Sequence, residues 1–430
     1  MTGAAAPAVN LTERLVRSAR HCYDGSEHYR RALDELGVSP EEIRTLADLD
    51  ALPILLDKAG EIALRERSMA EAGHPFGEHL CVPLDEVVGV SSTSGTTGDP
   101  TYYAFTREDI EITDELWARG FRLGGVRPGD TVMHAFGLSM FLAGVPVVRA
   151  LERMGARPVP VGAEAGSEKL LKIARQMKPV AICCTPSYGE YLAGKEDLTD
   201  LGIRHIFCAG EPGAGLPEVR ARLSAGFGGA TVTDMLGGVH GVMNVSCAAH
   251  AGMHMLAQDH SVQQLVDPDT GKAIELTDGA IGVRVKTTLD WRAQPQLRAS
   301  VGDVYEVLTA RCECGLEVPR ARVIGRTDDM LIIKGVKLYP AAVQNLVFEM
   351  RPQLTGHFRI VLEAPGPKVQ PPLRMRVEVA GESGTQDSVA ELAQRMHSRF
   401  SVTPDIEAVP AGSLPRTAHK VKLIEIDGRG

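Results

Sequence analysis

A run of hydroxyl-bearing and glycine residues lies between positions 91 and 101, where the sequence reads SSTSGTTGDPT. It follows a short apolar stretch, 82–90, of the kind that forms a strand. Backbone N–H groups and short hydroxyl side chains in such a turn can surround a phosphate group. No Lys-Ser or Lys-Thr pair follows the last glycine, so the segment is not a Walker A loop. A flexible surface loop is the alternative interpretation of this segment taken alone.

Two short motifs, which we call the cysteine pairs, could bind a metal ion. The first is a C-x-C formed by Cys312 and Cys314, and the second is a C-x-x-H formed by Cys247 and His250. Three cysteines and one histidine suit a tetrahedral structural zinc site. His254 and His260 lie near His250 in the sequence and are alternatives to it. Four protein ligands leave no open position, so such an ion would hold two loops together rather than catalyse a reaction.

Length and composition limit the classes of protein to consider. A chain of 430 residues is long enough for two domains. Its net charge of −9 argues against a nucleic-acid partner, which requires a basic surface. No stretch reaches the ~20 apolar residues needed to cross a bilayer, and residues 1–10 do not resemble a secretory signal. The 8 cysteines are too scattered for a disulfide framework, so we expect a cytoplasmic protein with no membrane partner.

Strand-like and helical segments alternate between residues 130 and 208. Strands are expected at 130–136, 157–161, 179–185 and 203–210, and helices at 141–156 and 167–178. This rhythm predicts a parallel sheet with helices on both faces. Ligands bind outside the carboxyl ends of such strands, where the loops CTPSY (184–188) and CAGEPG (208–213) follow two of them.

The C-terminal part has a different pattern. Residues 282–333 are richer in β-type alternation, and residues 339–430 predict a small α+β unit with helices at 340–350 and 388–400 and strands at 358–364 and 374–380. We place the boundary between residues 325 and 326.

Several motifs in one order carry a resemblance to a known family. They are SSTSGTTGDPTYYAFT (91–106), AICCTPSYGEYLA (181–193), AGEPGAG (209–215), GRTDDMLIIKGVKLYP (325–340) and GSLPRTAHKVKLIEID (412–427). Together they resemble the adenylate-forming superfamily of acyl-CoA synthetases, NRPS adenylation domains and luciferases, and within it the phenylacetate-CoA ligase branch. The resemblance implies an α/β fold. It would have a large N-terminal AMP-binding domain (1–325) with βαβ parallel sheets and a small mobile α+β C-terminal domain (326–430).

The resemblance also assigns roles to individual residues. The β- and γ-phosphates would bind at Ser94, Gly95, Thr96, Thr97 and Gly98, and the rest of the nucleotide at Glu211, Pro212, Asp234, Asp303 and Arg326. The acid would lie against Phe141, Tyr188, Gly237 and His240. Lys420, together with Thr97, would act in catalysis, because an ammonium group stabilises the negative charge that gathers on the phosphoryl oxygens. Asp328 would be the hinge between the domains.

Three positions depart from the family pattern. His240 stands where the family usually has a glutamate that helps to hold Mg²⁺, and imidazole is a poor ligand for that ion. Gln258 and Ser300 stand where relatives tend to have Glu and Arg. Three interpretations remain open: an active ligase with a weakened metal site, an enzyme for an unusual acid or nucleophile, and a degenerate homologue that binds ligand without turnover.

We therefore expect a ligase that adenylates a small, aromatic carboxylic acid with ATP and transfers the acyl group to CoA or another acceptor. The alternatives are amide formation, loading of a carrier protein and activation of nitrite, and a role in secondary metabolism is compatible with them. The expected cofactors are ATP, Mg²⁺ and a structural Zn²⁺, with CoA as a co-substrate. A homodimer is expected by analogy with the branch.

Overall fold

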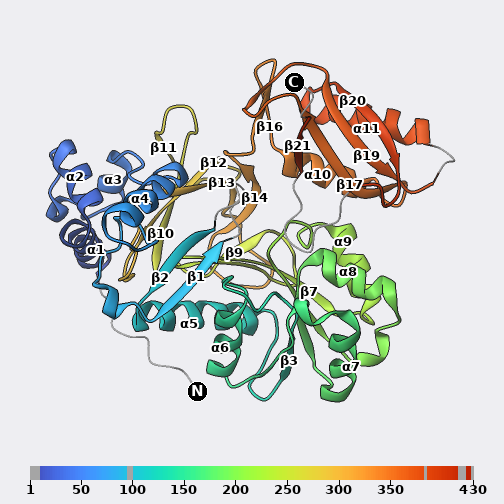
Figure 1. Ribbon diagram of the computed structural model, residues 1–430, viewed down its shortest axis with the longest axis horizontal. Helices are drawn as coiled ribbons and strands as arrows, with labels where there is room; N and C mark the ends of the chain where they lie inside the picture. The colour runs from blue at the N-terminus through green and yellow to red at the C-terminus, as the bar shows by residue number, and fades with distance from the viewer. Residues whose placement is uncertain (1–9, 94–99, 382–384, 415–422, 428–430) are drawn as a thin grey trace.

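The computed structural model describes residues 10–93, 100–381, 385–414 and 423–427. Two predicted parts of the site lie outside these ranges, namely the loop residues Ser94, Gly95, Thr96, Thr97 and Gly98, and Lys420. The described residues form a large N-terminal part and a smaller C-terminal part, drawn in orange and red at the upper right of Figure 1. The predicted α/β fold with parallel strands and a C-terminal domain is confirmed. The mobility of that domain stays a prediction.

Four helices begin the described chain: α1 (Leu11–Gly25), α2 (Glu27–Leu36), α3 (Leu46–Ala51) and α4 (Lys58–Glu71). Each starts at a side chain that accepts a hydrogen bond from the first turn, and these caps are Asn10, Ser26, Thr45 and Asp57. Their buried leucines form one apolar cluster with Leu289, Leu297 and Ala299, which come much later in the sequence. Figure 1 shows these helices in blue at one end of the molecule.

A short hairpin comes next. Strands β1 (Gly89–Thr93) and β2 (Thr101–Phe105) pair antiparallel, from Gly89 with Phe105 to Thr93 with Thr101. The predicted phosphate-binding segment joins the two strands. Helix α5 (Arg107–Leu123) follows and packs against α6 (Val145–Arg153).

A parallel sheet lies at the centre of the N-terminal part. Its strands run in the order β4 (Arg157–Pro160), β3 (Thr131–His134), β5 (Ala181–Cys184), β6 (His205–Cys208) and β7 (Thr231–Gly238). Helices α7 (Ser167–Met177), α8 (Pro186–Lys195) and α9 (Pro217–Gly226) connect them. The helix expected from residue 141 begins only at Val145. Residues 141–144 form a turn, in which Gly144 N donates to Phe141 O, and Pro146 lies in the first helical turn.

The sheet continues with antiparallel strands beyond β7. The order is β7, β8 (Val242–Ser246), β9 (Met253–Met255), β14 (Arg320–Arg326), β13 (Ala299–Leu308), β12 (Ile281–Thr288), β10 (Ser261–Val266) and β11 (Ala273–Ile274). This half carries Asp303, Arg326 and the two cysteine pairs. The β-rich region expected at 282–333 is therefore part of the same sheet as far as Arg326, whereas residues 331–333 pair in a separate small sheet.

The C-terminal part has its own core. It contains β15 (Leu331–Ile333), β16 (Val336–Leu338), α10 (Pro340–Glu349), β17 (Leu354–Leu362), β18 (Lys368–Val369), β19 (Leu373–Val379), α11 (Thr385–Phe400), β20 (Pro404–Pro410) and β21 (Ile424–Ile426). Buried residues from Leu331 to Val402 form a cluster of their own. The last strand of the large sheet, β14, ends at Arg326, and the predicted boundary lies there.

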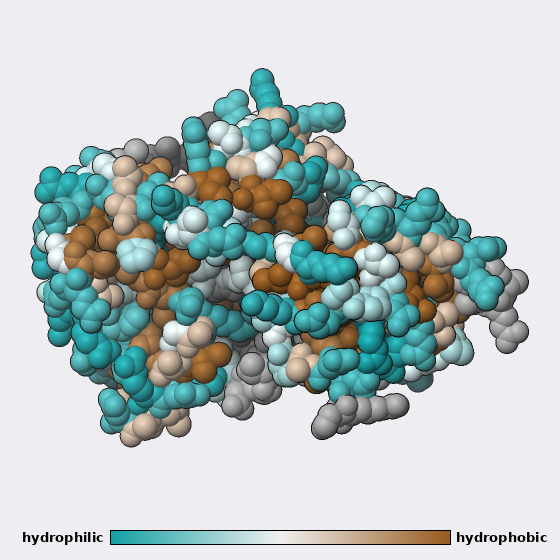
Figure 2. All heavy atoms as spheres, turned by 90° about the horizontal axis from the view of Figure 1, so that it is seen from above, coloured by the Kyte–Doolittle hydropathy of each residue, from teal (hydrophilic) through white to brown (hydrophobic). Residues whose placement is uncertain are grey.

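No helix in the described part of the chain combines the length and the apolar character that crossing a membrane requires. Figure 2 shows hydrophilic side chains over much of one face, with apolar ones gathered in separate patches between them.

Candidate active site

The hairpin β1–β2 holds both ends of the predicted phosphate loop. Before the loop, Ser92 N donates to Met140 O (2.7 Å), and Ser92 forms a β-bridge with Phe141. After it, Arg65 Nη1 donates to Pro100 O (2.6 Å). Phe141, predicted to contact the acid, therefore lies directly beside the hairpin.

The loops after β5 and β6 meet, as the parallel arrangement predicts. Ser187 N at the start of α8 donates to Glu211 Oε1 (2.7 Å), and Thr185 Oγ1 caps the helix by accepting from Tyr188 N (3.3 Å). Burial raises the pKa of Glu211. Pro212 follows in the same loop. The Tyr188 hydroxyl is buried and has no hydrogen-bond partner among the described residues.

Asp234 lies on β7, beside Cys208 of β6. Burial raises the pKa of this carboxyl to about 6. A Cβ on Gly215 would come within 3.1 Å of its Oδ2, so the glycine lets the 209–215 loop approach the carboxylate. A Cβ on Gly237 would lie 2.5 Å from the Trp117 ring, which places this predicted acid-binding glycine against α5.

Asp303 lies between two arginines. Its Oδ2 accepts from Arg284 Nη2 (2.8 Å) and its Oδ1 from Arg326 Nη1 (2.9 Å). Arg326 also holds Asp328 through Nε and Nη2 (2.8 and 2.9 Å), and Lys58 of α4 donates to Asp328 (2.7 Å). Burial alone would raise the pKa of Asp328, but the hydrogen bonds from Arg326 and Lys58 outweigh it and hold that pKa far below its usual range. The predicted ribose acid, its arginine and the hinge thus form one network.

His240 lies in the tight turn between β7 and β8, where both His240 and Gly241 have positive φ (61° and 69°). This conformation suits glycine or asparagine and strains most other residues. The ring is 1% exposed, and it packs edge-on against Tyr103 and Trp291. Burial lowers the pKa of His240 well below its usual range, and nearby Lys286 lowers it further.

Sequence reasoning missed Arg284, Lys286 and Glu61. They are buried in the region that connects His240 to Asp303. The signal that could have found Arg284 and Lys286 is IGVRVKTT (281–288), in which these two basic residues interrupt an otherwise apolar strand at a spacing of two.

The two cysteine pairs come together, with one difference in the histidine. The ligand atoms of Cys247, His254, Cys312 and Cys314 all lie within 4.8 Å of one another. His254 Nε2 lies 3.3 Å from Cys314 Sγ, and Cys247 Sγ lies 3.6 Å from Cys312 Sγ. His250, the expected histidine, is not in this group. It lies in a turn with φ of 51°, whereas β9 pairs with β14 and so brings His254 opposite Arg320.

Arg320 ties together the two loops that carry these ligands. Its Nη1 donates to Ala251 O and its Nη2 to Ala310 O (both 2.5 Å). The four ligands are therefore supported by protein contacts as well as by their own proximity. Soft sulfur and imidazole ligands of this number fit zinc.

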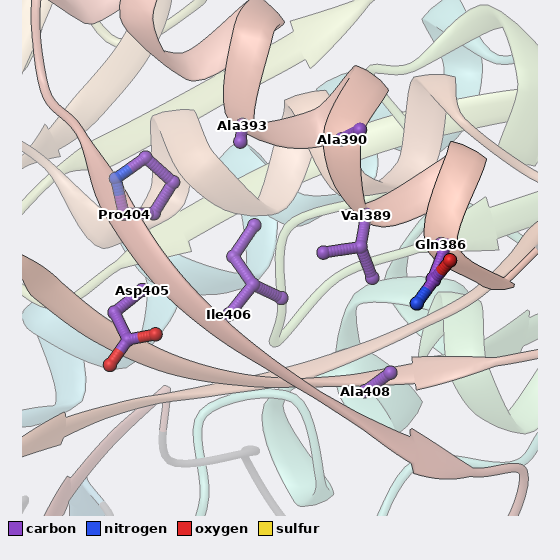
Figure 3. Close-up of a pocket in the computed structure, with 8 residues that line it drawn as sticks. All are labelled: Gln386, Val389, Ala390, Ala393, Pro404, Asp405, Ile406 and Ala408. Carbon is purple, nitrogen blue, oxygen red and sulfur yellow. The ribbon is translucent and has the colours of Figure 1, made fainter.

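A separate groove of about 330 Å³ lies between α11 and β20 of the C-terminal part, and Figure 3 shows its lining. Small and apolar side chains dominate it, and Asp405 is its one ionisable residue. It contains none of the predicted site residues.

Comparisons with known proteins agree with this arrangement. Residues 335–429 match the family of AMP-binding enzyme C-terminal domains. A phenylacetate-coenzyme A ligase from Thermus thermophilus is 32% identical, over 94% of this chain and 93% of the relative. The chain belongs to the phenylacetate-coenzyme A ligase family. Like the other AMP-forming acid–CoA ligases of this family, it adenylates an acid with ATP and transfers the acyl group to CoA.

Solved structures add information on the arrangement of the domains in this family. A 2-hydroxyisobutyryl-CoA ligase in the postadenylation state, bound to R3-HIB-AMP, matches with a TM-score of 0.84 at 28% identity, over 97% of this chain and 89% of that chain. The same ligase in the thioesterification state, bound to 2-HIB-AMP and CoA, matches with a TM-score of 0.68 at 29% identity and the same coverage. The two domains of the present chain are therefore arranged more as in the postadenylation state of that ligase than as in its thioesterification state.

Proposed function

We propose that this chain adenylates a small aromatic carboxylic acid and passes it to CoA through a single site at the domain junction. The observation that carries the proposal is the network of Asp303, Arg326 and Asp328. It joins the residue assigned to the ribose directly to the residue assigned to the hinge. A site in which the nucleotide ligand and the pivot share one arginine can couple the chemical step to the domain position.

ATP would bind between the hairpin β1–β2 and the network. The loop residues 94–98 would surround the phosphates, and the fixed ends of the hairpin would restrict their movement. The Asp303 carboxylate would accept hydrogen bonds from the ribose hydroxyls, because each oxygen has a second lone pair besides the one used by an arginine. Glu211, Pro212 and Asp234 would line the adenine side.

The acid would lie between Phe141 and Tyr188. Phe141 contacts the hairpin, and the buried Tyr188 hydroxyl can bind a polar group of a ligand. A carboxylate oxygen of the acid attacks the α-phosphorus of ATP, and pyrophosphate leaves. Lys420 would stabilise the charge on the phosphoryl oxygens. The CoA sulfur then attacks the acyl carbon, AMP leaves with the bonding electrons, and the thiol proton passes to solvent.

Metal ions would have two separate roles. Adenylate-forming ligases use ATP with Mg²⁺, which prefers hard oxygen ligands. The imidazole of His240 does not fit that preference, so we propose that the ion is held by ATP phosphates and water. At the other site, Cys247, His254, Cys312 and Cys314 would hold a structural Zn²⁺ that joins the two loops.

The proposal is tested by pyrophosphate release from ATP with a panel of aryl and small aliphatic acids, with and without CoA. We expect release with an aryl acid, and an acyl-CoA product when CoA is present. Further arms contain an amine, a carrier protein, or nitrite with an aryl amine. The variant Lys420→Ala should lose the adenylation step, whereas Lys272→Met, an exposed lysine of the β10–β11 hairpin, should not. If protein that binds ATP releases no pyrophosphate with any of the acids, the proposal is refuted.

A further inference from the structure

The hairpin β1–β2, which carries the predicted phosphate loop, has two edges that no further strand of the described residues covers. Its two strands form a sheet of their own. Each edge is bound by a loop instead. On the β1 side, Ser92 N donates to Met140 O (2.7 Å). On the β2 side, the buried Ala104 donates its N–H to Oε1 of the Gln294 side chain at 2.6 Å. A buried backbone donor at the edge of a strand needs an acceptor, and Gln294 supplies it.

The amide of Gln294 forms hydrogen bonds at both ends. The side chain is 0% exposed, and its Nε2 donates to Phe76 O (2.5 Å). The same nitrogen lies 3.3 Å from His79 Nε2. Burial lowers the pKa of His79 to about 3, so the ring is neutral and its nitrogen can accept. Phe76 and His79 lie between the end of α4 and the start of β1. One side chain therefore joins β2 to the segment that leads into β1.

Asp109 holds the backbone beside Gln294 in place. This fully buried carboxylate at the start of α5 accepts from Arg292 N (2.7 Å) and Ala293 N (2.9 Å). It also accepts from Thr106 N (2.9 Å), the residue directly after β2. These hydrogen bonds do not involve the Gln294 side chain. A change of that side chain should therefore leave the backbone of residues 292–294 in position and release only the edge of β2.

The position of Gln294 in the chain connects this contact to the nucleotide. Five residues after it, the chain enters β13, which carries Asp303, the predicted ribose ligand. The phosphate loop and the ribose acid would bind two parts of the same ATP molecule, so the hairpin and β13 must be held at a fixed separation. We propose that Gln294 is a positioning residue for adenylation, which sets the phosphate-loop hairpin against the segment leading into β13. This inference rests on the proposed function.

The test compares the binding of ATP and of AMP to the full chain by calorimetry with Mg²⁺ present. AMP lacks the two phosphates assigned to the loop, so it reports on the remaining nucleotide contacts. Gln294→Met keeps the length of the side chain and removes its hydrogen bonds. Gln294→Asn withdraws the amide from Ala104 but keeps a polar side chain, so it serves if the first variant does not fold. Gln264→Met is the matched control, because Gln264 is 6% exposed and its amide binds Asp50 Oδ1 of α3 (2.6 Å).

We expect both Gln294 variants to weaken ATP binding about tenfold, the size that one lost buried hydrogen bond allows, and to leave AMP binding unchanged. The backbone N–H groups of residues 101–106 should also exchange faster with deuterium, measured by mass spectrometry. Gln264→Met should change neither quantity.

Unchanged ATP binding in a folded Gln294 variant would overturn the inference and leave the proposed function intact. Equal weakening of ATP and AMP would also overturn it, because a general structural effect does not distinguish the two ligands. Weaker ATP binding without faster exchange in 101–106 would exclude the hairpin as the cause. A wild-type protein that binds neither ligand would refute the proposed function, and the inference with it.

Discussion

Arg351, two residues after the end of α10, is expected to hold the C-terminal domain against the N-terminal domain. Its Nη1 lies 3.1 Å from both carboxylate oxygens of Glu190, which belongs to α8 of the N-terminal domain. The two side chains are 13% and 22% exposed. The guanidinium also covers the ring of Phe348 (4.6 Å), which packs against the apolar cluster that includes Tyr188. The contact therefore reaches the helix that carries a predicted acid-binding residue.

The size of the effect follows from this burial. An exposed ion pair contributes roughly 0.2–1 kcal/mol, and breaking a fully buried one costs about 3–5 kcal/mol. A partly buried pair lies between these limits, so Arg351→Met should cost about 1–2 kcal/mol of domain contact. That corresponds to roughly a tenfold shift toward open arrangements. Other ion pairs between the two parts, among them Lys58–Asp328 and Lys337–Asp269, remain in this variant and keep the shift partial.

Small-angle X-ray scattering of the chain without substrates measures this shift, and Arg222→Met is the matched control. Arg222 also contacts Glu190 (2.8 Å), but it lies on α9 of the N-terminal domain. We expect Arg351→Met to increase the radius of gyration and Arg222→Met to leave it unchanged. If the two variants scatter alike, the reasoning is wrong, because the effect would then come from Glu190 itself and not from the domain contact.

Three other changes test the remaining sites. Cys312→Ser should lose bound zinc, measured by elemental analysis, and lower the melting temperature by several degrees, while chelation of the wild type should lower it equally. Asp303→Asn should raise the KM for ATP about tenfold or more in the pyrophosphate assay; an unchanged KM in folded protein would contradict the ribose role. Burial lowers the pKa of His79 to about 3, below its unfolded value, so stability should be lost as the pH falls from 6.5 toward 3, by up to about 5 kcal/mol. His79→Gln should flatten that dependence in urea unfolding at several pH values, and an unchanged slope would exclude His79 as its source.

The sequence patterns that predicted correctly are local ones. The alternation between residues 130 and 208 depends on side chains a few positions apart, and the strands β3, β4, β5 and β6 lie where it predicts them. The meeting of Ser187 and Glu211 was predictable too, because the carboxyl ends of neighbouring parallel strands share an edge. In both cases the information lies in the alternation of short strand and helix segments along the sequence.

The features that the sequence patterns did not predict depend on pairing between distant segments. His250 has a better spacing to Cys247 than His254 has, but the pairing of β9 with β14 decides which histidine reaches Cys314. The contact of Arg351 with Glu190 joins residues 161 apart in sequence. No pattern within either segment indicates it. Such contacts depend on the docking of whole elements, which short-range periodicity does not determine.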